Sequence, residues 1–142
     1  MAEPVEIRLA IPGDEDRISE AASLFDHLPR AWETQVFLEH DDHFLWLAYQ
    51  DRKPVGFLSS SIYRHPDKID ELFIHEIGVA EPARRQGIGR ALLDTAKHQA
   101  LRCNCRNIWV LAELRDDPAL GFYRSLGRPT ETPSVMFNWS LS

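Results

Sequence analysis

The stretch RRQGIGRALL (residues 84–93) places arginines beside two closely spaced glycines immediately before a predicted helix. The first turn of a helix leaves backbone N–H groups unpaired and carries partial positive charge, so it binds anions readily. Gly87 and Gly89 let the backbone approach an anion without an intervening Cβ. Three arginines add positive charge: Arg84, Arg85 and Arg90. These residues predict a phosphate-binding loop, although on their own they fit a tight turn with exposed cations equally well.

The loop does not match the commonest nucleotide-binding motifs. It is not a Walker loop, because no Gly-Lys-Ser/Thr follows the glycines. It is not a dinucleotide fingerprint either, because the spacing contains a single G-x-G. The kind of phosphate must therefore be inferred from the neighbouring residues.

The segment ELFIHEIGVA (71–80), just before the loop, is predicted to be a strand that carries three titratable side chains. Side chains alternate along a strand, so Glu71 and His75 are expected on one face and Glu76 on the other, unless a β-bulge changes the count. Partial burial would raise the pKa of Glu76 towards that of a general base, whereas His75 needs no such tuning. Glu76 is the predicted base and His75 its competitor; each residue also fits an ordinary half-exposed strand position.

Other reactive side chains favour no chemistry of their own. Cys103 and Cys105 lack a second ligand pair for zinc. They lie past the far end of the helix that follows the loop, roughly 20 Å from the phosphate site at helical rise, so covalent catalysis is not expected. HDDH (40–43) is interpreted as a solvated turn and not as a metal cluster. A reduced, cytoplasmic protein without a metal is the expectation.

The elements that must position these groups predict one α/β domain over residues 1–142. Strands are expected at 5–10, 43–50, 55–63, 71–80, 107–114 and 134–141, with the second and third forming a hairpin and 107–114 buried on both faces. Helices are expected within 12–28 and over 31–39, 88–102 and 117–123. The sheet would therefore be mixed.

Composition and charge exclude several classes of function. The 142 residues are 44% hydrophobic, which is enough for a core. We find no apolar run of membrane-spanning length and no signal pattern, and a net charge of −6 argues against a nucleic-acid binder. Acidic residues concentrate before residue 72, and the remainder is mildly basic. An anionic cofactor and a cationic acceptor would suit this division, although solvated surface charge is the simpler interpretation.

Two motifs together resemble the GNAT superfamily of N-acetyltransferases. R-x-x-G-x-G (84–89), between a strand ending in IGV and an amphipathic helix, is similar to the superfamily's pyrophosphate loop. ALGFYRSLG (119–127) is similar to its A-x-x-x-Y-x-x-x-G helix. The resemblance covers essentially the whole chain. It implies a central, mixed but mostly antiparallel sheet flanked by helices, in which strand 71–80 splays from strand 107–114 to form an acetyl-CoA cleft.

The resemblance also implies acetyl-CoA as co-substrate. Its pyrophosphate would lie on Arg84, Arg85, Gln86, Gly87, Ile88, Gly89 and Arg90. The pantetheine arm would pair with the backbone of Ile77, Gly78 and Val79, and an N–H near Val79 would donate to the thioester oxygen as it gains charge. Tyr123 matches the tyrosine that protonates the departing thiolate, although a tyrosine on a helix can also simply pack its ring in a core.

A narrower resemblance concerns the acceptor. ELFIHEIGV, RRQGIG, DDPALGFYRSLG and VMFNW are similar to the GNAT-type aminoglycoside 3-N-acetyltransferases. This implies a small cationic acceptor, the 3-amino group of an aminoglycoside, and antibiotic resistance. The predicted acceptor contacts are Asp26, His27, Glu71, Glu76, Asp116 and Asp117. The chain departs from that family in having His75 in place of an aromatic residue and in matching it only in outline over the first 70 residues.

Two other functions stay open. The first is acetyl transfer to another small amine, a polyamine or a protein amine. The second is an acetyl-CoA-binding regulator without turnover, which the presence of Glu76 and Tyr123 argues against. A homodimer is the superfamily's common assembly, and neither nucleic acid nor a membrane is an expected partner.

Overall fold

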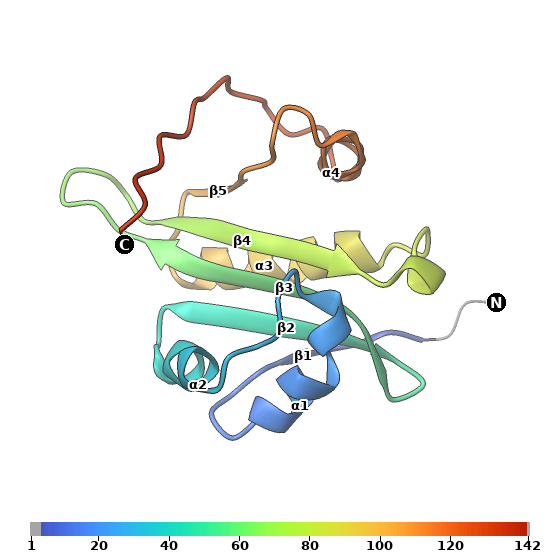
Figure 1. The fold of residues 1–142 in the computed structure, drawn as a ribbon. Helices are drawn as coiled ribbons and strands as arrows, with labels where there is room; N and C mark the ends of the chain where they lie inside the picture. The colour runs from blue at the N-terminus through green and yellow to red at the C-terminus, as the bar shows by residue number, and fades with distance from the viewer. Residues whose placement is uncertain (1–3, 142) are drawn as a thin grey trace. The chain divides into compact units, whose positions relative to one another are not determined.

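The structure is a computed structural model that describes residues 4–141. The chain divides into two compact units, residues 1–111 and 112–142. In the first unit five strands form one sheet in the order β1-β2-β3-β4-β5 (Figure 1). Their bounds are β1 Glu6–Leu9, β2 His43–Gln50, β3 Lys53–Tyr63, β4 Glu71–Val79 and β5 Asn107–Val110. The first four strands pair antiparallel and β5 pairs parallel to β4, which confirms the mixed, mostly antiparallel sheet.

The predicted hairpin is present. β2 and β3 are joined at Asp51 and Arg52, whose φ angles are 48° and 63°. Two consecutive residues with positive φ match the right-handed twist of the strands that they connect. Both strands are mostly buried along their middles and form the centre of the sheet.

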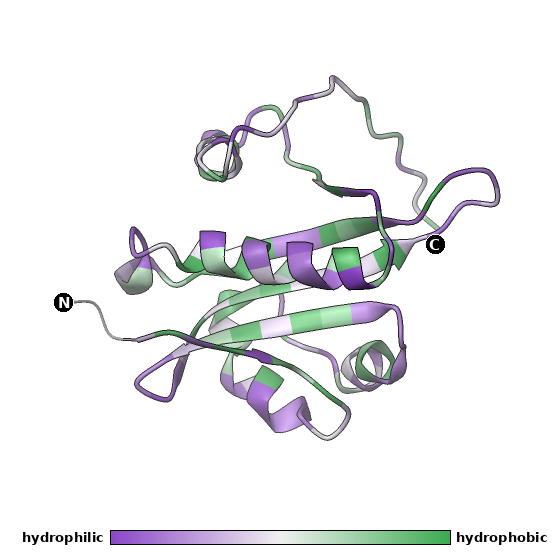
Figure 2. Ribbon diagram, turned by 180° about the vertical axis from the view of Figure 1, so that it is seen from behind, coloured by the Kyte–Doolittle hydropathy of each residue, from purple (hydrophilic) through white to green (hydrophobic). Residues whose placement is uncertain are grey.

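Helices cover both faces of this sheet (Figures 1 and 2). On one face lies α3 (Ile88–Arg102), as predicted, with the four-spaced side chains of Ile88, Leu92 and Ala96 at most 2% exposed. They share a core with Leu72 and Ile74 of β4. Burying each large aliphatic side chain contributes about 1.5–3 kcal/mol, so this packing determines which face of β4 is turned inward.

The opposite face carries α1 (Glu15–Glu20), the short 3-10 helix η1 (Ala22–Leu24) and α2 (Ala31–Glu39), and a second 3-10 helix, η2 (Glu81–Ala83), follows β4. The second predicted helix is confirmed with the expected bounds. The first is interrupted, because α1 ends at Glu20 and the chain becomes extended at Phe25. None of the helices among residues 4–141 is long and apolar enough to span a membrane.

Two strand predictions were wrong. β5 ends at Val110, four residues earlier than expected, and none of its residues is fully buried, because it forms the edge of this sheet. Residues 128–141 of the second unit contain no helix or strand, so the strand predicted over 134–141 is not formed. An isolated extended segment within this unit has no ladder partner for its backbone groups.

The second unit contains α4 (Asp117–Arg124). Its start is set by Asp116, whose Oδ1 accepts a hydrogen bond from the backbone N–H of Ala119 at 3.1 Å. Beyond its end, the Arg124 guanidinium forms two hydrogen bonds of 2.8 Å to the carboxylate of Glu131. This short helix is close to the predicted one, which ended at residue 123.

Candidate active site

A β-bulge in β4 forms the core of the candidate site. In the pairing of β3 with β4, Ser59 lies opposite Glu76 while the next residue, Ser60, lies opposite Ile74. His75 is therefore the extra residue of the bulge. The bulge changes the alternation of side chains at this point in the strand.

The core contacts show the consequence. On the near side of the bulge Ile74 packs in the α3 core, and on the far side Ile77 packs against the same core. Ile74 and Ile77 are three positions apart, whereas a regular strand places residues of one face an even number of positions apart. His75 and Glu76 consequently both point away from α3. The expectation that His75 and Glu76 lie on opposite faces was wrong. The reason is the β-bulge, which changes the alternation of side chains along β4.

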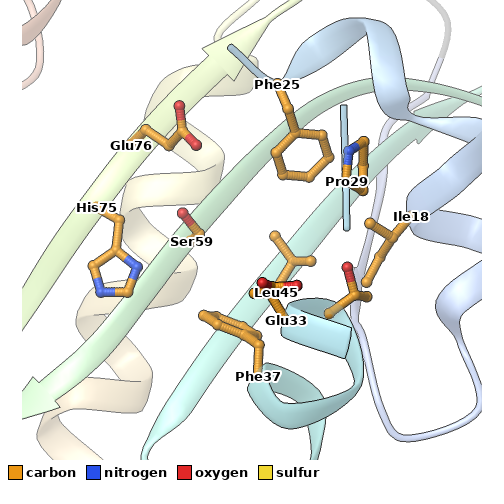
Figure 3. Close-up of a pocket in the computed structure, with 10 residues that line it drawn as sticks. Ile18, Phe25, Pro29, Glu33, Phe37, Leu45, Ser59, His75 and Glu76 are labelled. Atoms are coloured by element: carbon orange, nitrogen blue, oxygen red, sulfur yellow. The ribbon is translucent and has the colours of Figure 1, made fainter. Parts of the chain in front are cut away.

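His75 and Glu76 line a cavity of about 250 Å³ between β4, α2 and the connection after η1 (Figure 3). The lining is mostly apolar and comes from segments far apart in the chain: Ile18, Phe25, Pro29, Glu33, Thr34, Phe37, Leu45 and Ser59, besides His75 and Glu76. Sequence reasoning missed the contribution of α2. The available signal was that Glu33 and Phe37 are four residues apart and so share one face of that helix.

The surroundings of Glu76 raise the pKa of its carboxyl group. Burial raises its pKa, and the charge of Asp26 together with a hydrogen bond to Asp26 raises it further. His27 acts in the opposite direction and lowers the pKa of Glu76. The loop after η1 thus brings Asp26 and His27 near Glu76, and their role as acceptor contacts stays a prediction. A carboxyl group whose pKa lies above its ordinary range is suited to accept and release a proton near neutral pH.

His75 is held in its neutral form. Burial lowers the pKa of its imidazole, and the nearby His43 lowers it further. Its Nε2 lies 2.9 Å from the hydroxyl oxygen of Ser61 on β3. This hydrogen bond orients the ring at the cavity wall.

Another carboxylate lies in the pocket wall on α2. The Nε of Arg30 donates a hydrogen bond of 2.9 Å to Oε1 of Glu33, and this bond lowers the pKa of Glu33. Glu33 is therefore ionised at neutral pH while Glu76 holds its proton more tightly. The cavity combines an apolar lining with carboxyl groups of different proton affinity, a combination suited to an organic cation.

The far half of β4 has an unpaired backbone edge. β5 pairs with β4 from Glu71 to Ile74, whereas β4 continues to Val79. Among the described residues of the first unit, no strand pairs with this edge of residues 77–79. Within this part of the chain, the backbone of the edge is free of a partner strand and can hydrogen-bond an extended ligand, and it begins next to the cavity residue Glu76. Binding of a pantetheine arm there stays a prediction.

The glycine loop follows this edge directly. Gly87 is the N-cap of α3 with φ 79°, and a Cβ at this position would have no atom within 4 Å. The first hydrogen bond of the helix runs from Ala91 N to Gly87 O at 2.9 Å. The N–H groups of Ile88 and Gly89 therefore have no acceptor within the helix. An open approach to such N–H groups fits a phosphate.

The side chains around the loop complete this cradle. Arg84 donates from Nε to the Val79 carbonyl at 3.1 Å, which ties the loop to the end of β4. Arg85 has a positive φ of 66°, and Gln86 forms a 2.7 Å side-chain hydrogen bond with Gln50. The guanidinium groups of Arg84 and Arg85 belong to exposed residues and can reach a bound anion.

The remaining predicted residues are more dispersed. On β4, Glu71 accepts a 2.8 Å hydrogen bond from Asn107 Nδ2. Asp116 caps α4, Asp117 starts it, and the Tyr123 ring lies 5.4 Å from that of Phe122. These last residues belong to the second unit. Their roles toward acceptor and thiolate stay predictions.

The other reactive side chains have structural surroundings. Cys105 is buried, and this burial raises the pKa of its thiol, which makes it a poor nucleophile. In the segment 40–43, Asp42 pairs with Arg64 at 3.0 Å, and the ring of His40 stacks on that of His43 at 4.2 Å. Within residues 4–141 no group of His, Cys, Asp and Glu side chains is arranged to hold a metal ion.

Comparison with known proteins now identifies the fold. A model of the acetyltransferase (GNAT) family matches residues 13–127. Mycothiol acetyltransferase from Corynebacterium efficiens is 28% identical over 102 residues, which are 72% of this chain and 32% of that protein. The chain thus spans about a third of the length of this relative.

Solved structures match over nearly the full length. An aminoglycoside acetyltransferase from an uncultured soil metagenomic sample, solved in complex with sisomicin, is 23% identical with a TM-score of 0.89, and the match covers 97% of both chains. Aminoglycoside N-acetyltransferase AAC(6')-Iy, solved in complex with CoA, is 20% identical with a TM-score of 0.83, and the match covers 99% of this chain and 97% of that one. These likenesses establish the shared α/β fold.

Proposed function

The chain belongs to the acetyltransferase (GNAT) family, and we propose that it transfers acetyl from acetyl-CoA directly to an amine of an aminoglycoside. The observation that carries this proposal is the bulge in β4. It places the tuned carboxyl group of Glu76 in an apolar cavity, at the point where the unpaired edge of the strand begins. A proton acceptor and a strand edge for an extended cofactor then meet in one place.

The residues around the glycine loop would hold the cofactor. The N–H groups of Ile88 and Gly89, with the guanidinium groups of Arg84 and Arg85, would bind the pyrophosphate, and the edge of residues 77–79 would bind the pantetheine arm. Acetyl-CoA, when bound, supplies the acetyl group as a thioester. The positive φ of Gly87 and the open space around its Cα support this fit, because they leave the first N–H groups of α3 accessible to an anion.

Glu76 would act as the general base. An acceptor amine arrives as an ammonium ion and must lose a proton before its nitrogen can attack. Glu76 takes that proton, while neutral His75 keeps the wall of the cavity in place through Ser61. Tyr123 is the proposed acid that returns a proton to the leaving sulfur.

The charges near the cavity support a cationic acceptor. Asp26 lies beside Glu76, and Glu33 lines the same cavity, so an entering ammonium ion is met by several carboxyl groups. Aminoglycosides carry several such ions. The resemblance of residues 71–79, 84–89 and 116–127 supports the 3-amino group as the acetylated position, whereas the relative solved with CoA carries the 6' designation in its name.

A smaller amine is the second candidate. The cavity of about 250 Å³ is below the roughly 300–1,000 Å³ of pockets for drug-sized ligands. A cavity of this volume is closer to the size of a single amino-sugar ring or another small amine than to that of a multi-ring antibiotic. The likeness to a mycothiol acetyltransferase is compatible with such an acceptor.

The test is release of free CoA thiol from acetyl-CoA with gentamicin, sisomicin, apramycin, spermidine, glucosamine and a lysine peptide as acceptors. We expect turnover with the aminoglycosides, and mass spectrometry with NMR of the product then identifies the acetylated nitrogen. Turnover confined to spermidine, glucosamine or the peptide would replace the aminoglycoside by that amine. Binding of acetyl-CoA without turnover on any acceptor would favour a regulator.

A further inference from the structure

A row of aromatic rings continues from the acceptor cavity along β4. His75 lines the cavity, and the ring of Phe73 lies 5.2 Å from its ring. Phe73 stacks on Trp109 of β5 at 4.4 Å, and Trp109 meets Tyr63 of β3 edge-on at 5.8 Å. We call Phe73, Trp109 and Tyr63 the aromatic row. It connects three strands into one apolar surface that begins at the cavity wall.

The aromatic row lies on the face of β4 opposite α3. Leu72 and Ile74, the neighbours of Phe73, are at most 1% exposed and point into the α3 core, so Phe73 points the other way. Phe73 is paired in register with Trp109. Both are half-buried, and Tyr63 is 43% exposed. Ring surface is therefore available beside the cavity.

The cavity is too small to hold a whole multi-ring acceptor, so such an acceptor needs a further binding surface beside it. If the acceptor is a multi-ring aminoglycoside, a cavity of about 250 Å³ holds the reacting ring, and the other rings must lie outside it. On the side of His75, the adjoining surface is the aromatic row. Because the ring of Phe73 adjoins that of His75, the remaining rings of the acceptor can lie along the aromatic row.

The chemistry of the row matches an amino sugar. The faces of Trp and Tyr rings attract ammonium groups, and their flat apolar surfaces pack against apolar ligand surface. Glu71 lies opposite Tyr63 across the β3–β4 ladder, and its Oε2 is held by Asn107 at 2.8 Å. A carboxylate at the end of the aromatic row adds negative charge where a further ammonium group would lie.

We propose that the aromatic row is a second acceptor subsite, which binds the rings of a multi-ring amino sugar that lie outside the cavity. This inference depends on the proposed function, since it concerns the same acceptor. It assigns binding, and not proton transfer, to Phe73, Trp109 and Tyr63.

The experiment compares sisomicin with glucosamine, a one-ring amine, on four proteins. Trp109→Leu with Phe73→Leu removes the ring faces and keeps apolar bulk, whereas Trp109→Phe with Phe73→Tyr keeps the rings. Leu101→Ala is the control, because Leu101 is 69% exposed on α3. Each cation–π contact strengthens binding about two- to fivefold. Loss of two such contacts in the double leucine variant should therefore raise the KM and Kd for sisomicin about tenfold, with little change in kcat. The aromatic variant should stay near wild type.

The Kd values from calorimetry make the test independent of turnover. If wild type acetylates no aminoglycoside, the proposed function fails, while a sisomicin Kd that rises with loss of the rings still supports the subsite. Equal Kd values for wild type and the leucine variant, or no sisomicin binding at all, overturn the subsite. An equal loss for glucosamine also overturns it, since the rings would then act on the cavity itself. Thermal unfolding of each variant verifies that the sheet is intact.

Discussion

The proposed phosphate loop and the proposed acceptor cavity are built in opposite ways. The loop is made of consecutive residues, 84–90, whose backbone torsions and helix N-terminus are local properties. The cavity is made of α2, the connection after η1, β3 and β4, which meet only in the folded sheet. A ligand common to a family can be bound by a short motif, whereas a particular acceptor is selected by segments that tertiary packing brings together.

The largest expected effect separates chemistry from cofactor binding. Glu76→Gln removes the proposed base without changing the size of the side chain, so kcat should fall by about 10²–10⁴. The Kd for acetyl-CoA, measured by calorimetry, should stay the same, because the loop is untouched. In wild type, kcat/KM should fall as the pH drops through the raised pKa of Glu76. A variant that keeps its rate and its pH profile would remove Glu76 from the mechanism and favour His75.

Gly78→Ala tests how tightly β4 packs against β3 next to the cavity. A Cβ there would lie 2.7 Å from Cε1 of Phe57, in a packed region. Overpacking of this kind costs about 1–3 kcal/mol, so the free energy of unfolding in urea should fall by that amount. Gly121→Ala is the matched control: its Cβ would meet nothing within 4 Å in α4, and it should stabilise slightly. If both changes were neutral, β4 would be looser than its packing indicates.

Gly87→Ala tests the loop. Gly87 has φ 79°, and an alanine in the left-handed region costs about 1–2 kcal/mol. The loop should respond by shifting, and the Kd for acetyl-CoA should rise about tenfold while acceptor binding stays unchanged. Gly13→Ala is the matched control, since Gly13 has φ 100° and open space around it but lies in another loop. Gly13→Ala should lower stability to a similar extent and leave the Kd for acetyl-CoA unaltered. If the Kd for acetyl-CoA rose to a similar extent in both variants, global destabilisation would explain the effect.

The smallest effect concerns stability and pH. The pKa of Glu76 is raised by folding, so its stabilising contribution is fully present below the unfolded pKa and is lost as the pH rises through the folded one. Glu76→Gln should therefore melt at a higher temperature than wild type at neutral pH, and the difference should shrink below about pH 4, near the ordinary glutamate pKa. Melting curves from pH 3.5 to 8 measure this difference. A constant difference in melting temperature across that range would mean that folding does not raise the pKa of Glu76.

Much of the scaffold could be predicted from the sequence. The bounds of α2 and α3 followed from helical periodicity, and the hairpin of β2 and β3 followed from two apolar runs around a short polar turn. These features depend on nearby residues. The predicted strand over 134–141 failed because a strand requires a partner ladder, and an alternating apolar pattern does not supply one.

The candidate site was predicted less completely. Glu76 and Asp26 were expected near the acceptor, and folding brings them together. The α2 wall with Glu33 and Phe37 was missed, because a helix beside the sheet can present any face until its packing is known. The shared face of His75 and Glu76 could not be predicted, since a β-bulge depends on how β3 pairs with β4.

The sequence by itself indicated the family and the proposed phosphate loop, because the positive-φ Gly87 and a helix N-terminus act within a few residues of one another. The tertiary structure alone decided the acceptor side. Burial and the neighbouring Asp26 set the proton affinity of Glu76, and the bulge directs it into the cavity. Proton affinity and side-chain direction at this site depend on groups that are distant in the chain, and folding alone brings them within reach.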